Sequence, residues 1–210
     1  MPSIKRLALI GSGSGTTADA VATATAIEAE VAIIIGNNSK SGIFDVAARH
    51  GIQNVHLSGV THPDPVLRDS SMLDALSEAQ VDLIVLAGYM KKIGPRVLRA
   101  YEHRIVNTHP ALLPAYGSTG MYGDRVHEAV LHDRAPTTGA TVHLVTEEYD
   151  AGPVLAQVPV HVLASDDVSS LRGRVQLAEK KLLVDWLSDW ATTGKILPAA
   201  RAPGHQLNET

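Results

Sequence analysis

The stretch that decides the fold lies near the N-terminus and reads Leu7-Ala8-Leu9-Ile10-Gly11-Ser12-Gly13-Ser14-Gly15-Thr16-Thr17. Its first four residues form a short apolar run, which is typical of a strand buried on both faces. The glycines then predict a tight loop, and residues 17–29 have a helical pattern. A buried strand, a glycine loop and a helix in this order predict the first unit of an open α/β sheet.

Further along the chain, apolar runs alternate with helical patterns. We expect strands at 31–35, 54–57, 81–87 and 104–106, and helices at 42–50, 66–78 and 95–101. Continuous apolar strands between helices indicate a Rossmann-like, open, mostly parallel twisted sheet with helices on both faces. The rhythm changes after residue 110, where we expect a helix at 124–132, an antiparallel portion with strands at 140–146 and 154–162, and a long helix at 167–190.

The length of 210 residues suits one domain. We expect a single unit over residues 1–194, with a phosphate-binding half at about 1–100 and a catalytic half at about 101–194. Residues 195–210 are rich in Pro, Ala and Gly toward the end, which predicts a flexible tail.

Composition excludes several classes of protein. Charged residues make up 19% of the chain, the net charge is −4, and no basic stripe with interleaved aromatics occurs, so we expect no nucleic-acid partner. The absence of cysteine excludes disulfides and thiolate chemistry and fits a cytoplasmic protein. No apolar run is long enough for a signal peptide or a membrane span. His127 and His132 lie five residues apart on different helix faces, so we expect no metal.

Two separated motifs place polar, titratable side chains where strands end. Asn107-Thr108-His109-Pro110 follows the apolar Ile105-Val106, and Asp150-Ala151-Gly152-Pro153 follows the strand-like Ala140 to Val145. Open α/β sheets place their chemistry at such strand ends. An amide, an imidazole and a carboxylate together can polarise a carbonyl, stabilise an oxyanion and move a proton.

The glycine loop at residues 11–17 favours an anion, because glycines let backbone amides approach it and the helix N-terminus attracts negative charge. A dinucleotide such as NAD would need an acidic residue at the end of the second strand. That strand ends at Ile35-Gly36-Asn37-Asn38, with no carboxylate. A phosphate monoester is therefore the favoured ligand, and a strand–helix turn without a ligand is the alternative.

Taken together, the motifs resemble a known family. They are Gly13-Ser14-Gly15-Thr16, Asn37-Asn38-Ser39-Lys40, Leu86-Ala87-Gly88-Tyr89-Met90, Asn107-Thr108-His109-Pro110-Ala111-Leu112-Leu113-Pro114, Gly139-Ala140-Thr141-Val142-His143 and Asp150-Ala151-Gly152-Pro153. Their order and spacing resemble the phosphoribosylglycinamide formyltransferases, folate-dependent enzymes of purine synthesis, over about residues 5–190. Gly120-Met121-Tyr122-Gly123 with Val126 to Val130 resembles one branch of that family.

The resemblance implies transfer of a formyl group from 10-formyltetrahydrofolate to the amine of glycinamide ribonucleotide. It also implies a catalytic set of Asn107, His109 and Asp150, with His143 as a support behind them. The implied contacts of the ribonucleotide are Gly13, Gly15, Thr16, Thr17, Gly88, Thr108, Pro110, Gln176 and Glu179. The implied contacts of the folate are Arg68, Met90, Lys91, Lys92, Ile93, Leu98, Ile105, Val145, Glu147, Glu148 and Asp150.

Several of these residues also have a structural interpretation. Asn107 could be a cap, His109 a satisfied histidine beside Pro110, and Asp150 a turn residue. His143 could equally pack in the core. Arg68 could be a surface residue beside Asp69, and the Glu147 and Glu148 carboxylates could be solvated while only their backbone acts.

The chain departs from the family pattern at three places: Thr17 where Asn is frequent, Ser118 where Gly is common, and Lys180-Lys181 after Glu179. These changes leave open a paralogue that formylates another phosphorylated amine. A formyltetrahydrofolate hydrolase is a second alternative, although we expect no room for the additional N-terminal domain of those relatives. Nor do residues 191–210 suffice for the added C-terminal domain of relatives that formylate tRNA or nucleotide sugars. A binding protein without catalysis and an NAD dehydrogenase are the least favoured readings. The sequence leaves a monomer and a homodimer open.

Overall fold

A computed structural model describes residues 4–197 of the chain. Its elements, in order, are β1 Lys5–Gly11, α1 Thr16–Thr23, β2 Ala29–Gly36, α2 Ile43–His50, β3 Gln53–His56, α3 Pro65–Glu78, β4 Leu83–Leu86, α4 Pro95–Ala100, β5 Ile105–His109, α5 Asp124–His132, β6 Thr137–Leu144, β7 Val154–His161 and α6 Val168–Thr193. The expected tail at 195–210 lies largely outside the described residues.

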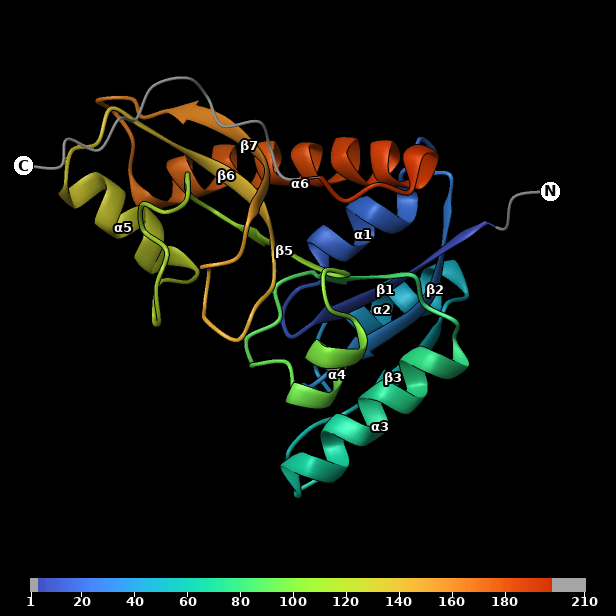
Figure 1. The fold of residues 1–210 in the computed structure, drawn as a ribbon. Helices are drawn as coiled ribbons and strands as arrows, with labels where there is room; N and C mark the ends of the chain where they lie inside the picture. Colours follow the sequence, from blue (N-terminus) through green and yellow to red (C-terminus); the bar gives the residue numbers. More distant parts are fainter. Residues whose placement is uncertain (1–3, 198–210) are drawn as a thin grey trace, which may run out of the picture.

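One seven-stranded sheet runs through the molecule in the order β3-β2-β1-β4-β5-β6-β7 (Figure 1). The strands from β3 to β5 are parallel, whereas β6 is antiparallel to β5 and β7 is antiparallel to β6. From β1 the chain first adds β2 and β3 on one side and then returns to add β4 and β5 on the other, so the direction of strand addition reverses between β1 and β4. Ligands of open α/β sheets bind at such a reversal, outside the carboxyl ends of the strands. The expected fold class is therefore confirmed, including its antiparallel C-terminal portion.

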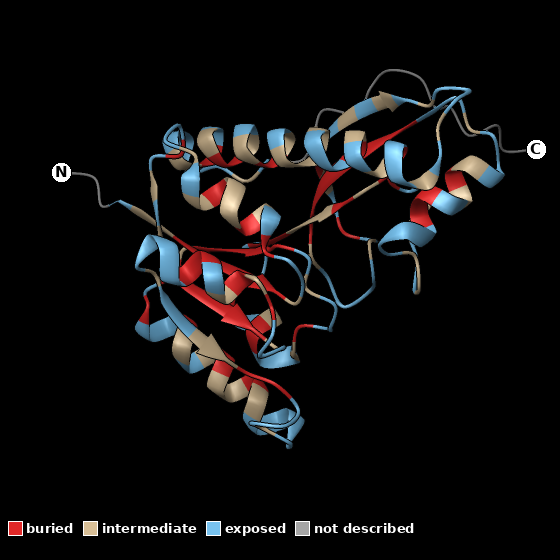
Figure 2. Cartoon of the chain, turned by 180° about the vertical axis from the view of Figure 1, so that it is seen from behind, coloured by how far each residue is buried: buried red, intermediate tan, exposed pale blue. Residues whose placement is uncertain are grey.

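The core lies on both faces of the sheet, as the buried strands in Figure 2 show. On one face, Val21 of α1, Val46 of α2 and Leu183 of α6 pack against buried residues of β1, β2 and β4. On the other face, Leu76 of α3 and Val97 just inside α4 pack against the same sheet. Because both faces are covered, the central strands are continuously apolar, which made them visible in the sequence.

Several boundaries differ from the sequence-based expectation. Helix α1 ends at Thr23 instead of continuing to residue 29, because the chain must turn at 24–28 and β2 already begins at Ala29 to pair with Lys5 of β1. Strand β6 begins at Thr137, earlier than expected. Strand β5 continues beyond Val106 to His109, because β6 pairs with it across Asn107 to His109.

Candidate active site

The centre of the site lies on the last residues of β5 and on the strand β6 beside it. Asn107 is directly opposite His143, and His109 is directly opposite Thr141. Side chains alternate between the faces of a strand, and opposed residues of an antiparallel pair share a face. Asn107, His109 and His143 therefore point to one side of the sheet, while Thr108 points to the other.

Asp150 reaches the same place from the connection between β6 and β7. Its backbone has a φ of +54°, a left-handed conformation that aspartate tolerates better than most residues. The returning chain lies very close to the end of β6, since a Cβ added to Gly152 would be 1.9 Å from the Leu144 carbonyl oxygen. Glycine at 152 is thus required for the approach that brings Asp150 to β5.

Four side chains from these segments form one cluster. The Asp150 carboxylate lies between the two imidazoles, with 3.5 Å from Oδ2 to His109 Nδ1 and 3.6 Å from Oδ1 to His143 Nε2. The Asn107 amide nitrogen is 3.2 Å from His143 Nε2. The side chains of His109, His143 and Asp150 are 4%, 3% and 11% exposed. So little solvent strengthens each electrostatic interaction in the cluster.

The hydrogen bonds assign the proton on His143. Its Nδ1 is 2.9 Å from the Leu144 carbonyl oxygen, which can only accept, so Nδ1 carries the hydrogen. In the neutral ring Nε2 is then an acceptor, and it takes a hydrogen bond from the Asn107 amide nitrogen. This contact fixes the orientation of the Asn107 side chain and leaves the second amide hydrogen for another acceptor.

His109 is held from both sides. Its Nε2 is 2.8 Å from the carbonyl oxygen of Tyr116, so Nε2 donates to the loop that follows β5. Its Nδ1 faces the Asp150 carboxylate at ion-pair distance. Burial holds the pKa of His109 below its ordinary value of 6.5, while Asp150 and the Tyr116 carbonyl act in the opposite direction. Burial likewise lowers the pKa of His143, opposed by the Leu144 carbonyl and Asp150.

The glycine loop lies at the carboxyl end of β1. Gly15 has a φ of +79° and packs against Gly42, and the Gly13 carbonyl accepts from the Ser41 hydroxyl at 2.6 Å and from the Gly42 amide at 3.0 Å. No side chain caps the N-terminus of α1, where Thr16 and Thr17 begin the helix. The first amides of α1 are thus open to an anion.

A second group of polar residues lies on the other face of β5. The Thr108 hydroxyl donates to the Glu179 carboxylate on α6. Burial raises the pKa of Glu179, against the effects of this hydrogen bond and of Lys180. Gln176, one turn earlier on α6, is exposed. The structure therefore brings Thr108 and Glu179 together.

The residues expected at the folate lie in two groups, one at residues 90–105 and the other in the loop that follows β6, at residues 145–150. Met90, Lys91 and Lys92 are exposed, whereas Ile93 and Ile105 are buried and Leu98 is half-buried. Lys92 joins the two groups: its Nζ is 3.3 Å from the Glu147 carbonyl oxygen and 4.9 Å from the centre of the Tyr149 ring. Val145 binds Ile105 through its backbone amide at 2.9 Å. The Glu147 and Glu148 side chains are exposed.

Arg68 is placed differently from these residues. Its guanidinium donates to the His62 carbonyl at 2.7 Å, so it holds the turn before α3. The neighbouring Asp69 does not pair with it, because the Asp69 carboxylate accepts from the backbone amides of Arg96 and Val97 at the start of α4. Arg68 also lies close enough to Tyr89 to oppose the rise in that residue's pKa that burial causes, and its expected contact with the folate stays a prediction.

Two contacts at the site carried no signal in the sequence. The Tyr116 carbonyl that binds His109 is a backbone group, and any residue type provides one. The Ser12 hydroxyl accepts a hydrogen bond from the Met90 backbone amide at 2.9 Å and so joins the glycine loop to the segment that begins at Met90. The serine could have been noticed as a loop hydroxyl, but its partner is far away in the sequence.

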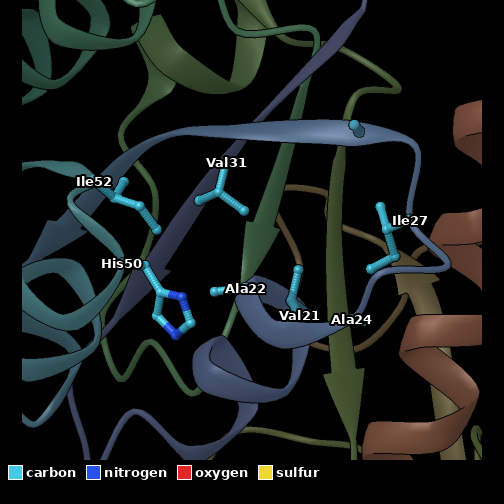
Figure 3. A pocket seen from close by; sticks show the side chains of 8 residues that line it. Val21, Ala22, Ala24, Ile27, Val31, His50 and Ile52 are labelled. Atoms are coloured by element: carbon cyan, nitrogen blue, oxygen red, sulfur yellow. The ribbon is translucent and has the colours of Figure 1, made fainter.

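A separate pocket of about 240 Å³ lies between α1, β2 and the end of α2 (Figure 3). Seven of its eight lining residues are apolar, and His50 is the exception. It contains none of the expected site residues. Across residues 4–197, no cluster of three or more His, Cys, Asp or Glu is arranged to hold a metal ion. No described helix combines the length and apolar character needed to cross a membrane.

Comparison with known proteins places this geometry in a family. The sequence profile described as formyl transferase matches residues 5–187, which include β5, β6 and the loop that carries Asp150. The chain belongs to the formyl transferase family. The resemblance seen in the sequence is thereby confirmed.

Individual members of the formyl transferase family are similar over most of the chain. A chloroplastic phosphoribosylglycinamide formyltransferase of Arabidopsis thaliana is 41% identical over 157 residues, which cover 74% of this chain and 54% of that protein. The phosphoribosylglycinamide formyltransferase of Mycobacterium tuberculosis is 36% identical over 77% of this chain and 73% of its own length. The crystal structure of phosphoribosylglycinamide formyltransferase from Bacillus halodurans has a TM-score of 0.82 at 33% identity, covering 93% of this chain and 100% of that one. The chain spans about half the length of the plant relatives it matches.

Proposed function

We propose that this protein transfers the formyl group of 10-formyltetrahydrofolate to the primary amine of glycinamide ribonucleotide, a step of purine synthesis. The observation that carries the proposal is the cluster of half-buried Asn107, buried His109 and half-buried Asp150 at the end of β5 in a chain of the formyl transferase family. Relatives that share 36–41% identity with this chain carry the name of that activity.

The cluster suits an acyl transfer with balanced proton movements. The amine nitrogen attacks the formyl carbon, and the carbonyl electron pair moves onto the oxygen. The second amide hydrogen of Asn107 and the Nε2 hydrogen of His109 donate to that oxyanion. The carbon–nitrogen bond to the folate then breaks. The amine nitrogen loses a proton and the folate nitrogen gains one, with Asp150 carrying it directly or through a water.

His109 must change partners for this step. Its Nε2 hydrogen points to the Tyr116 carbonyl, and an oxyanion needs the same hydrogen. The loop around Tyr116 therefore moves away, or the ring turns, when the donor binds. Asp150 keeps its contact with Nδ1 and favours the protonated ring, which is the stronger donor.

His143 acts as a positioning residue in this proposal. Its Nδ1 hydrogen bond to Leu144 makes Nε2 an acceptor, and that acceptor holds the Asn107 amide. A ring in the other tautomer would present a hydrogen to the Asn107 nitrogen and lose the contact.

The substrates are assigned to the two sides of the cluster. The phosphate of the ribonucleotide binds at Gly13, Gly15, Thr16 and Thr17, where the α1 amides are uncapped. Gly88, Thr108 and Pro110 border it, and Gln176 with Glu179 contacts the sugar or the glycinamide. The folate binds between Met90 to Ile93, with Leu98 and Ile105 behind them, and the loop from Val145 to Asp150. Arg68 takes part only if it leaves the His62 carbonyl.

The chain departs from the family pattern at Thr17, Ser118 and Lys180. Because of these departures, another phosphorylated amine is the second candidate for the formyl acceptor. With Thr at position 17 the helix still provides a hydroxyl and backbone amides, so a phosphate remains the anchor. A hydrolase, in which water replaces the amine, uses the same cluster.

The proposal is tested by a steady-state assay with 10-formyl-5,8-dideazafolate as a chromophoric donor. Consumption that requires glycinamide ribonucleotide supports it. Consumption without an amine would instead assign a hydrolase. Binding of the donor without consumption would assign a different acceptor, or a binding protein if further phosphorylated amines also fail.

Related expectations stand with this proposal. Residues 1–194 act as one catalytic unit, with the phosphate in the half before residue 100 and the formyl chemistry in the half after it. We place the protein in the cytoplasm, as a monomer or homodimer.

A further inference from the structure

Ser12 joins the glycine loop to the segment that begins at Met90 by two hydrogen bonds. Its backbone amide donates to the Gly88 carbonyl oxygen at 3.1 Å, and its hydroxyl accepts from the Met90 amide at 2.9 Å. Among the described hydrogen bonds of residues 12–15, these two are the ones that reach residues 88–93. The loop expected to hold the acceptor phosphate is therefore linked through Ser12 to the segment expected at the folate.

A second serine holds the glycine loop from another side. The Gly13 carbonyl oxygen accepts from the Ser41 hydroxyl at 2.6 Å and from the Gly42 amide at 3.0 Å. These contacts attach the loop to the connection between β2 and α2. The hydroxyls of Ser12 and Ser41 thus both make contacts of the glycine loop, but the Ser12 hydroxyl is the one that reaches Met90.

The Ser12–Met90 hydrogen bond lies in a part of the chain that can open locally. Strand β4 ends at Leu86 and α4 begins at Pro95, so the Met90 amide lies outside the helices and strands. Ser12 is half-buried and Met90 is 49% exposed, which lets water compete for both groups. Such a hydrogen bond opens at a small cost in free energy, so its population responds to a ligand that fixes either partner.

We propose that Ser12 couples the two substrate sites, so that the acceptor phosphate and the folate donor bind with positive cooperativity through the Ser12–Met90 hydrogen bond. A phosphate on the α1 amides fixes the glycine loop, and a fixed loop presents the Ser12 hydroxyl to Met90 at a lower cost in conformational entropy. The donor then meets a segment that is already ordered. Because coupling between binding sites is reciprocal, the donor strengthens acceptor binding by the same factor. This inference rests on the proposed function and makes Ser12 a positioning residue that acts through Met90.

The test measures binding of 5,8-dideazafolate, which lacks the formyl group and therefore does not react, with and without saturating glycinamide ribonucleotide. The coupling factor is the ratio of its two dissociation constants. We expect a factor of about 2- to 10-fold in the unmodified protein, since the net contribution of one neutral hydrogen bond corresponds to an equilibrium factor of that size. In Ser12→Ala the factor should fall close to one.

Amide hydrogen exchange at Met90 provides a second measurement that does not depend on the folate. Glycinamide ribonucleotide alone should slow the exchange of the Met90 amide in the unmodified protein, because a fixed glycine loop keeps the Ser12 hydroxyl on that amide. In Ser12→Ala the ribonucleotide should leave the exchange rate of this amide unchanged. Thermal melting shows that each variant is folded.

Ser41→Ala is the matched control, because it also removes a hydroxyl contact of the glycine loop but leaves the link to Met90 in place. It should weaken binding of the ribonucleotide alone and keep the coupling factor. A factor near one in the unmodified protein, an unchanged factor in Ser12→Ala, or an equal loss in both variants overturns the coupling and leaves the two substrate sites in place. If the unmodified protein binds neither ligand, the proposed function and the coupling both fail.

Discussion

Asp150→Asn removes one charge from the cluster without altering its backbone, because asparagine tolerates the left-handed conformation of residue 150 at least as well as aspartate. In the proposed mechanism Asp150 stabilises protonated His109 and carries a proton. Two unit charges at the 3.5 Å that separate Asp150 Oδ2 from His109 Nδ1 attract by roughly 4.7 kcal/mol at an effective dielectric constant of about 20. The Asp150 side chain is 11% exposed, so screening reduces this figure, and we take roughly 3 kcal/mol.

That free energy corresponds to a loss of about 10²-fold in kcat, which we expect in the steady-state assay at neutral pH. The dissociation constant of the donor should change much less, because the charge acts on the transition state. Glu102→Gln is the control, since Glu102 also contacts a histidine, His103 Nε2 at 3.7 Å, but with the histidine side chain 77% exposed. A kcat for Asp150→Asn close to that of the unmodified protein, or an equal loss in Glu102→Gln, would refute the reasoning.

Three other predictions concern the catalytic histidine, the buried histidines and a glycine. His109→Ala should abolish turnover while the donor still binds, and His132→Ala should leave turnover intact; weakened folding of His109→Ala in a melting experiment would show a structural role instead. Burial lowers the folded-state pKa of His109, His127 and His143 below the ordinary 6.5, so the unfolded chain takes up protons first as the pH falls. The free energy of unfolding should therefore be highest above pH 6.5 and decrease below it, by up to about 1.4 kcal/mol per pH unit and histidine, in urea titrations. The pKa of Glu179 is raised above its ordinary value of 4.5, so its protonation opposes this loss of stability at pH values above 4.5. A free energy of unfolding that stays constant from pH 8 to 5 would contradict the burial argument. Gly152→Ala places a Cβ 1.9 Å from the Leu144 carbonyl oxygen and should destabilise the protein by about 1–3 kcal/mol with loss of activity, whereas Gly173→Ala on an open face of α6 should add about 0.5–1 kcal/mol. Equal melting temperatures for the two variants would count against the tight turn.

The sequence was most informative where burial on both faces made strands uniformly apolar. The runs at Leu7 to Ile10 and Ile33 to Ile35 are strands in the structure, and their alternation with helices was enough to predict the fold class. The end of β5 could not be predicted from the sequence. The polar residues Asn107 to His109 end the apolar run, although these residues still pair with β6. Likewise, nothing local in residues 24–28 ends α1; the position of β2 does.

The candidate site, like the fold, could be predicted from the sequence only in part. Asn107, His109 and Asp150 could be grouped from their motifs, and the structure brings them together from two segments, β5 and the connection between β6 and β7. Their roles stay predictions. The tautomer of His143 and the Tyr116 carbonyl on His109 depend on distances between backbone and side chains that no motif encodes. Arg68 was grouped with the folate by resemblance, but its distance to the His62 carbonyl reveals a structural contact.

The most direct test of the formyl transfer follows an isotopically labelled formyl carbon through a single turnover with glycinamide ribonucleotide, observed by NMR. The account predicts that the label appears in a formamide on the ribonucleotide, in step with loss of the donor, and that Asp150→Asn slows its appearance. Label recovered as free formate, or retained on the donor while both substrates are bound, would contradict the assignment.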